Sequence, residues 1–188
     1  MRQISHLTPV YIYYKLKDII YQKLHPTDPW LTPESIGILE KIIAKDHIGF
    51  EYGSGRSTIW FAKRTKYLTS VETSDIWYKK IKANLTSLAF SNVNLLYIPI
   101  DDSDGIDQNN YFFVSQNFLD NSLDYVLIDG RYRDQCLINF IPKIKLGGIL
   151  IIDNVNRYVP SNSSSPGSIE LGGDYYSELW SLIDKKLK

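Results

Sequence analysis

The chain has 188 residues, of which 44% are hydrophobic and 22% charged, and this balance is typical of a globular protein with one domain. Its 21 basic and 21 acidic residues give a formal net charge of zero, so the overall charge favours neither nucleic acid nor an anionic membrane as a partner. The single cysteine, Cys136, excludes an internal disulfide and a cysteine-rich zinc site, and no apolar run is long enough to span a bilayer. Because no signal peptide is visible, we expect a cytoplasmic protein.

Two helices are expected before the first strand. Residues 8–24 have apolar side chains at helical spacing, with Thr8 as the cap and Pro9 at the first helical position. We expect this helix to pack on the domain; the alternative is contact with a membrane surface or a partner. After a connector over residues 25–31, Thr32 and Pro33 repeat the start signal and predict a helix to about residue 45. The pattern divides the chain into a helix and connector over residues 1–31 and a main domain over residues 32–188.

The rest of the chain alternates short strands with helices. Strands are predicted at residues 47–52, 67–72, 93–100, 123–129 and 149–153, and helices at 56–64, 74–88, 111–119 and 131–145. This alternation predicts an α/β fold with a mainly parallel sheet and helices on both faces. Residues 156–173, rich in Ser, Asn, Gly and Pro, are predicted to form a long loop, and residues 174–187 a final helix.

The most informative segment is GFEYGSGRST, which joins the first predicted strand to the next helix. Gly53 and Gly55 allow a tight turn whose backbone can approach a ligand closely. Glu51, two residues before the turn, suits a cationic ammonium group and would crowd a pyrophosphate. Thr58 stands where the dinucleotide fingerprint has its third glycine. The segment favours a nucleotide-type ligand and argues against a nicotinamide dehydrogenase.

A second acid, Glu72, ends the second predicted strand, about 20 residues after the turn. A carboxylate at this position can accept both hydroxyls of an adenosine ribose. The pattern Glu51-x-Gly53-x-Gly55 followed by Glu72 resembles the class I methyltransferases that depend on S-adenosylmethionine (SAM), and the similarity covers roughly residues 32–155.

The resemblance implies a Rossmann-like methyltransferase fold and SAM as the cofactor of the main domain. In that family the glycine turn wraps the methionine part of SAM, the acid matching Glu72 holds the ribose, and an acid after the third strand often faces the adenine. Asp101 or Asp102 matches the last position, although both could equally be solvated loop acids. The cofactor-binding residues predicted in this way are Glu51, Gly53, Ser54, Gly55, Ser57, Glu72, Thr73, Asp101 and Asp129. Trp77 either stacks on the adenine or fills the core, and we favour the core.

Oxygen-bearing side chains also follow the fourth and fifth predicted strands, namely Asp129 and the pair Asp153 and Asn154. Such a set suits Mg²⁺ or Ca²⁺, and it is similar to the metal site of cation-dependent O-methyltransferases of the catechol and caffeoyl-coenzyme A type. There the metal holds two neighbouring substrate oxygens. Those enzymes carry a lysine base three residues after the first aspartate, where this sequence has Tyr132. The favoured alternative is that Asp129 contacts cofactor or substrate directly, while Asp153 and Asn154 cap the strand and turn.

No histidine is expected on this rim of the sheet, so Asp129 is the candidate catalytic residue. Arg131 and Arg133 either grip an acidic or phosphorylated substrate or are surface arginines at a helix start, and the second is favoured. The predicted function is SAM-dependent methylation of an oxygen on a small-molecule or sugar-type (glycan) acceptor. The alternative is a SAM-binding module without transferase activity.

The methyltransferase fold usually continues after its fifth strand with a helix and an antiparallel strand pair. The segment after Asn154 is mostly the predicted loop and final helix, so the strand pair is expected to be truncated or absent. Three alternatives remain open: a naturally minimal chain, a truncated one, or one completed by a partner subunit, for example in a homodimer.

Overall fold

The computed structural model of the protein describes residues 8–100 and 110–187. The chain forms two compact units, one of Thr27–Asp153 and one of Met1–Pro26 with Asn154–Lys188. The first boundary lies near the predicted division after residue 31. The second boundary, after Asp153, was not predicted, because a main domain extending to residue 188 was expected.

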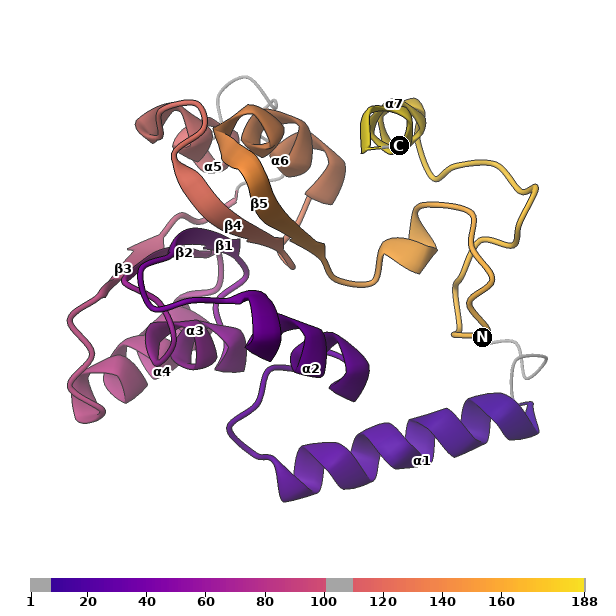
Figure 1. The fold of residues 1–188 in the computed structure, drawn as a ribbon, viewed down its shortest axis with the longest axis horizontal. Helices are drawn as coiled ribbons and strands as arrows, with labels where there is room; N and C mark the ends of the chain where they lie inside the picture. The colour runs from indigo at the N-terminus through magenta and orange to yellow at the C-terminus, as the bar shows by residue number, and fades with distance from the viewer. Residues whose placement is uncertain (1–7, 101–109, 188) are drawn as a thin grey trace. The chain divides into compact units, whose positions relative to one another are not determined.

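The unit of residues 27–153 is built on a five-stranded parallel sheet with the order β3-β2-β1-β4-β5 (Figure 1). Its strands are β1 (Ile48–Tyr52), β2 (Tyr67–Glu72), β3 (Val93–Tyr97), β4 (Leu123–Ile128) and β5 (Ile144–Ile152). Figure 1 shows α3 (Arg56–Ala62) and α4 (Asp75–Ser87) on one side of the sheet, and α5 (Asn110–Phe113) and α6 (Arg133–Phe140) on the other. The predicted α/β fold is confirmed. The strand order reverses between β1 and β4, where open α/β sheets place their ligands.

The centre of the sheet is covered on both faces, which explains its apolar sequence. Phe50 and Tyr52 of β1 and Val126 and Ile128 of β4 have no exposed surface. The ring of Phe50 stacks on Phe140 of α6 with 4.0 Å between centroids. Each such buried side chain stabilises the fold by roughly 1.5–3 kcal/mol. The two central strands are therefore the most firmly held part of the sheet, and their carboxyl ends form a rigid base.

Threonine followed by proline starts both N-terminal helices as predicted. In α1 (Pro9–Leu24) the Thr8 hydroxyl accepts from a backbone N–H of the first turn, and Thr32 does the same for α2 (Pro33–Ile42). The second helix ends at Ile42 rather than near residue 45. Throughout the two described ranges, no helix has both the length and the apolar character that crossing a bilayer requires.

Two predicted boundaries fail at prolines. The strand predicted over residues 93–100 ends at Tyr97, before Pro99, which cannot donate to a sheet. The helix predicted over residues 131–145 ends at Phe140, followed by the 3₁₀ turn η4 (Ile141–Lys143) that contains Pro142. Strand β5 then begins at Ile144, inside the predicted helix.

The C-terminal part of the second unit contains the 3₁₀ turn η5 (Val155–Arg157), an irregular segment and α7 (Glu178–Leu187). Its only described pairing of the β type is an isolated bridge between Ser161 and Glu170. Within residues 154–187, no strand extends the sheet, which agrees with the predicted absence of the terminal strand pair.

Candidate functional site

The turn between β1 and α3 presses its backbone against the loop that follows β4. Gly53 has a φ of 90°, and a Cβ on this residue would lie 2.8 Å from the backbone oxygen of Asp129. Its N–H donates to the carbonyl of Val71 on β2 at 2.9 Å. The position therefore requires glycine for both its conformation and its surroundings, as the sequence predicts.

Glu51 lies beneath this turn and is completely buried. Its Oε2 accepts hydrogen bonds from the hydroxyls of Thr58 at 2.6 Å and Ser70 at 2.7 Å, while its Oε1 has no partner among the described residues. Burial raises the pKa of the Glu51 carboxyl to about 7, although hydrogen bonds from Ser57, Thr58 and Ser70 lower it. The Thr58 hydroxyl also accepts from the N–H of Gly55 at 2.8 Å. Thr58, noted in the sequence only as a missing glycine, thus ties the turn to Glu51.

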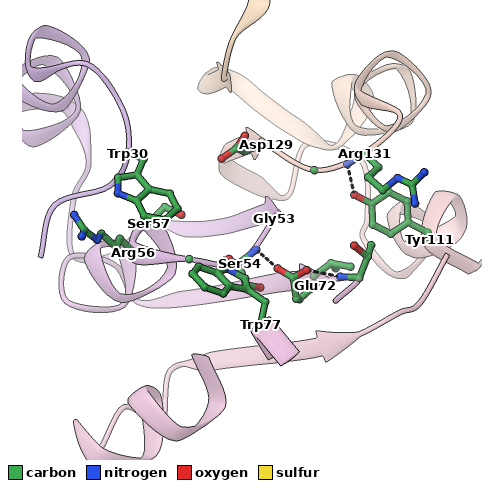
Figure 2. Close-up of a pocket in the computed structure, with 14 residues that line it drawn as sticks. Trp30, Gly53, Ser54, Arg56, Ser57, Glu72, Trp77, Tyr111, Asp129 and Arg131 are labelled. Atoms are coloured by element: carbon green, nitrogen blue, oxygen red, sulfur yellow. Dashed lines mark hydrogen bonds between the residues drawn. The ribbon is translucent and has the colours of Figure 1, made fainter. Parts of the chain in front are cut away.

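Glu72 ends β2 and is held by three backbone N–H groups, and Figure 2 shows the bond from Ser54. Its Oε1 accepts from Thr73 and Ser74, both at 2.8 Å, and its Oε2 accepts from Ser54 at 3.2 Å. Because Ser54 belongs to the glycine turn, this carboxylate links the ends of β1 and β2. Only 7% of Glu72 is exposed, so the carboxylate is held firmly in one place.

A cavity of about 300 Å³ lies along this rim of the sheet. It is lined by every predicted cofactor-binding residue except two. Glu51 is not a lining residue, because it lies below the turn, and Asp101 lies outside the described residues. The lining residues that had been predicted are Gly53, Ser54, Gly55, Ser57, Glu72, Thr73 and Asp129.

Two tryptophans and an arginine border the same cavity. Trp30 stacks near Trp77 with 6.2 Å between ring centroids, and the guanidinium of Arg56 lies 5.2 Å from the Trp30 ring (Figure 2). The indole N–H of Trp77 donates to the backbone oxygen of Ser54 in the turn. Trp77 is therefore a half-buried residue of the cavity and not a core residue, which corrects the prediction. Trp30 was missed because it lies in a connector without a motif.

Tyr111 of α5 closes another side of the cavity. Its carbonyl accepts from the hydroxyl of Tyr52 at 2.7 Å, and its own hydroxyl accepts from the N–H of Arg131 at 3.2 Å. A Cβ at Gly130 would lie 2.1 Å from that hydroxyl, so the glycine leaves the space that the tyrosine fills. The sequence offered no signal for Tyr111 beyond a short predicted helix.

Asp129 and Asp153 follow β4 and β5, and one guanidinium reaches both. The Nη2 of Arg133 lies 2.7 Å from Oδ1 of Asp129, and its Nη1 lies 3.6 Å from Oδ2 of Asp153. Burial, and next the neighbouring Asp153, raise the pKa of Asp129 to about 7, although Arg133 acts to lower it. The side chain of Arg133 is only 14% exposed, so it is not the surface arginine that the sequence favoured.

Of the predicted metal ligands, the structure brings Asp129 and Asp153 together beside Arg133. Residues 8–100 and 110–187 contain no group of three or more His, Cys, Asp or Glu side chains arranged to hold a metal ion. Asn154 belongs to the second unit, where it adopts a left-handed conformation with φ of 54° before η5. The N–H of the preceding residue, Asp153, donates to the carbonyl of Ile128 at 3.1 Å.

Comparison with known proteins gives similarity in structure alone. No protein-family model matches the chain, and no curated protein matches it. Among solved structures, a methyltransferase-like protein from Silicibacter pomeroyi superposes with a TM-score of 0.55 and 24% identity, over 68% of this chain and 73% of the other.

Two further solved structures have the same arrangement at lower identity. Precorrin 8w decarboxylase from Methanobacterium thermoautotrophicum gives a TM-score of 0.51 at 17% identity, over 66% of this chain and 63% of that one. The YcgJ protein of Bacillus subtilis gives 0.51 at 12% identity, over 81% and 67%. The fold of this chain is therefore the Rossmann-like methyltransferase fold, with fewer strands than usual. A fold shared with a protein described as a decarboxylase leaves the chemistry to the site.

Proposed function

We propose that the protein is a SAM-dependent methyltransferase that binds its cofactor in the cavity at the carboxyl ends of β1, β2 and β4. The observation that carries this proposal is Glu72, a nearly buried carboxylate fixed at the end of β2 beside a glycine turn that excludes a Cβ. An anionic group in this place suits the hydroxyls of a nucleoside and opposes a pyrophosphate. The cavity, at about 300 Å³, is at the small end of ligand sites.

The hydrogen bonds of Glu72 limit how it would hold a ribose. A carboxylate accepts about four hydrogen bonds, and three positions are used by the N–H groups of Ser54, Thr73 and Ser74. One position remains, on Oε2. In this arrangement Glu72 accepts from one ribose hydroxyl, whereas the sequence suggested both.

In this proposal, the other residues that line the cavity contact either the cofactor or the methyl acceptor. When bound, SAM supplies a methyl group on a positively charged sulfur. The stacked Trp30 and Trp77 offer flat apolar surface, and the carboxylate of Asp129 offers negative charge and an acceptor for a proton. With a pKa of about 7, Asp129 can take the proton of an acceptor hydroxyl near neutral pH. Catalysis otherwise consists of holding nucleophile, methyl group and sulfur in line.

The acceptor and the assembly are further parts of this proposal. We assign the acceptor to small molecules or sugars with a reactive oxygen, and not to nucleic acid, because the chain has no net charge. A cytoplasmic location and a homodimer remain predictions.

A SAM-binding module without transferase activity is the second candidate. It is favoured by one observation, namely that within residues 154–187 no strands continue the sheet beyond β5. In this case cofactor binding would remain and methyl transfer would not be detectable.

Calorimetry with SAM, S-adenosylhomocysteine (SAH) and NAD tests the cofactor. We expect saturable binding of SAM and SAH and no binding of NAD. Binding of NAD without binding of SAM or SAH would overturn the proposal. Turnover of SAM with sets of hydroxylated and glycosidic acceptors, corrected for hydrolysis, then separates the two candidates. Binding without turnover for every acceptor class favours the module.

A further inference from the structure

The guanidinium of Arg133 lies beside both carboxylates that the sequence offered as metal ligands. Arg133 comes from the first turn of α6, and it reaches Asp129 after β4 and Asp153 after β5. The three side chains thus join two neighbouring strand ends through one cation. This arrangement could not be read from the sequence, where Arg133 only follows the fourth strand closely.

Backbone oxygens fix the guanidinium in the same place. Its Nε donates to the carbonyl of Gly130 at 3.1 Å, its Nη2 lies 3.4 Å from the carbonyl of Asp129, and its Nη1 donates to the carbonyl of Asp153. All three nitrogens therefore have acceptors on the ends of β4 and β5. A planar group held on three sides is a fixed internal cation, and it is not available to grip a substrate anion.

A divalent cation does not fit this arrangement. Mg²⁺ requires oxygen ligands at about 2.0–2.1 Å in nearly octahedral geometry. An ion bound to Oδ1 of Asp129 would lie beside the Nη2 of Arg133, which is itself 2.7 Å from that oxygen. Two like charges this close, in a partly buried site, repel strongly. The residues present thus do not fit the metal of the cation-dependent O-methyltransferases.

We infer that Arg133 takes the place of that metal and is the positioning residue that holds Asp129 at the edge of the cavity. The inference rests on these three side chains and does not depend on the proposed cofactor. One consequence is that Asp129 and Asp153 form no site for a divalent cation while Arg133 is in place. A second consequence is that removal of the guanidinium takes away the cation beside these two carboxylates, and a divalent cation can then take its place.

Titration of the full chain with Mn²⁺, followed by electron paramagnetic resonance and by calorimetry, tests both consequences. We expect that the wild type shows no saturable binding that depends on Asp153 at millimolar metal, and that Arg133→Gln gains one new site. The new site should disappear in the double variant Arg133→Gln, Asp153→Asn, because one carboxylate is lost. Arg133→Lys should also lack it, since it retains the positive charge.

Arg131→Gln is the matched control, because Arg131 lies two residues away and borders the same cavity. It should gain no Mn²⁺ site. A merely structural role for Arg133 would destabilise the protein without creating a metal site, so the gain of binding separates the two roles. Circular dichroism establishes that each variant is folded.

Two results would overturn the inference. The first is saturable Mn²⁺ binding by the wild type that Asp153→Asn abolishes, and this result does not depend on whether any Arg133 variant folds. The second is a folded Arg133→Gln protein that binds no Mn²⁺. Binding of SAH is measured on the same samples, so that a failure of the proposed cofactor is distinguished from a failure of this inference.

Discussion

The two ends of β4 carry aspartates in opposite electrostatic situations. At the amino end, burial raises the pKa of Asp124, but bonds from Lys145 at 2.7 Å and from the Ile48 N–H at 2.8 Å outweigh it and leave that pKa below its usual value. At the carboxyl end, burial and Asp153 together raise the pKa of Asp129 to about 7 in spite of Arg133. One strand thus has a carboxylate with a lowered pKa at one end and a carboxylate with a raised pKa just beyond the other.

Cavity size alone would select the end of the sheet opposite to the proposed site. A cavity of about 440 Å³ lies at the amino end, against about 300 Å³ at the carboxyl end. The larger cavity is bordered by the ion pair of Asp124 and Lys145, which already neutralise each other. The smaller cavity is lined by Glu72, which three backbone N–H groups hold, and by Asp129, whose pKa is raised. Carboxylates whose pKa is shifted by burial and by neighbouring charges indicate a functional site better than cavity size does.

The largest expected effect comes from closing the glycine turn. Gly53→Val places a side chain where φ is 90° and the Asp129 oxygen is 2.8 Å away. Backbone strain and overpacking together should lower the free energy of unfolding by about 3–5 kcal/mol. Urea denaturation measures it. Gly37→Ala is the control, since Gly37 lies in α2 with no atom near its missing Cβ, and it should stabilise by about 0.5–1 kcal/mol. Equal losses in both variants would contradict the assigned role of the turn.

Glu51 should make stability depend on pH. Its pKa of about 7 lies above the usual value of 4.5, so the folded protein binds the proton more tightly than the unfolded chain does. The stabilisation is complete below about pH 4.5 and is lost as the pH rises through 7, a change on the order of 3 kcal/mol. Glu51→Gln should remove this part of the pH dependence. The free energy of unfolding of both proteins is measured by urea denaturation across this pH range. An equal dependence on pH in the wild type and in Glu51→Gln would show the expectation to be wrong.

Glu72→Gln tests the proposed cofactor site at the carboxyl ends of the strands by its effect on SAH binding. The carboxylate is surrounded by N–H donors, so an amide NH₂ must face one of them and the negative charge is lost. A charged hydrogen bond contributes about 1.5–3 kcal/mol, so the affinity for SAH should fall by about 10–100-fold. Calorimetry measures this affinity. Glu40→Gln, at an exposed ion pair with Arg64, should leave it unchanged. Unaltered SAH binding by the Glu72 variant would remove this residue from the site.

The smallest effect is expected at the amino end. Asp124→Asn breaks the pair with Lys145, whose side chain is 42% exposed, so the free energy of unfolding should fall by no more than about 1 kcal/mol. Because the pKa of Asp124 is lowered by folding, this contribution should be present at neutral pH and vanish as the pH falls through that pKa. Affinity for SAH should not change. A large loss of SAH affinity would mean that the two ends of β4 are coupled.

Local chemistry predicted much of the fold. Thr8 and Thr32 cap their helices as expected, and the strand at residues 67–72 has the predicted limits, because caps and apolar periodicity act within a few residues. Two of the failed boundaries lie at Pro99 and Pro142, whose missing N–H groups interrupt the strand and the helix. The strand alternation also placed the glycine turn, Glu72 and Asp129 on one rim of the sheet.

The sequence by itself determined which side chains lie at the strand ends, because the succession of strands along the chain and the turns between them depend on neighbouring residues. Only the tertiary structure brought Trp30 and Tyr111 to the cavity and placed Arg133 across Asp129 and Asp153. It also decided the protonation of Glu51 and Asp129, because a pKa depends on burial and on charges that are remote in the chain. The amino-acid sequence determines at which strand end a carboxylate lies, and the packing around the carboxylate determines its pKa.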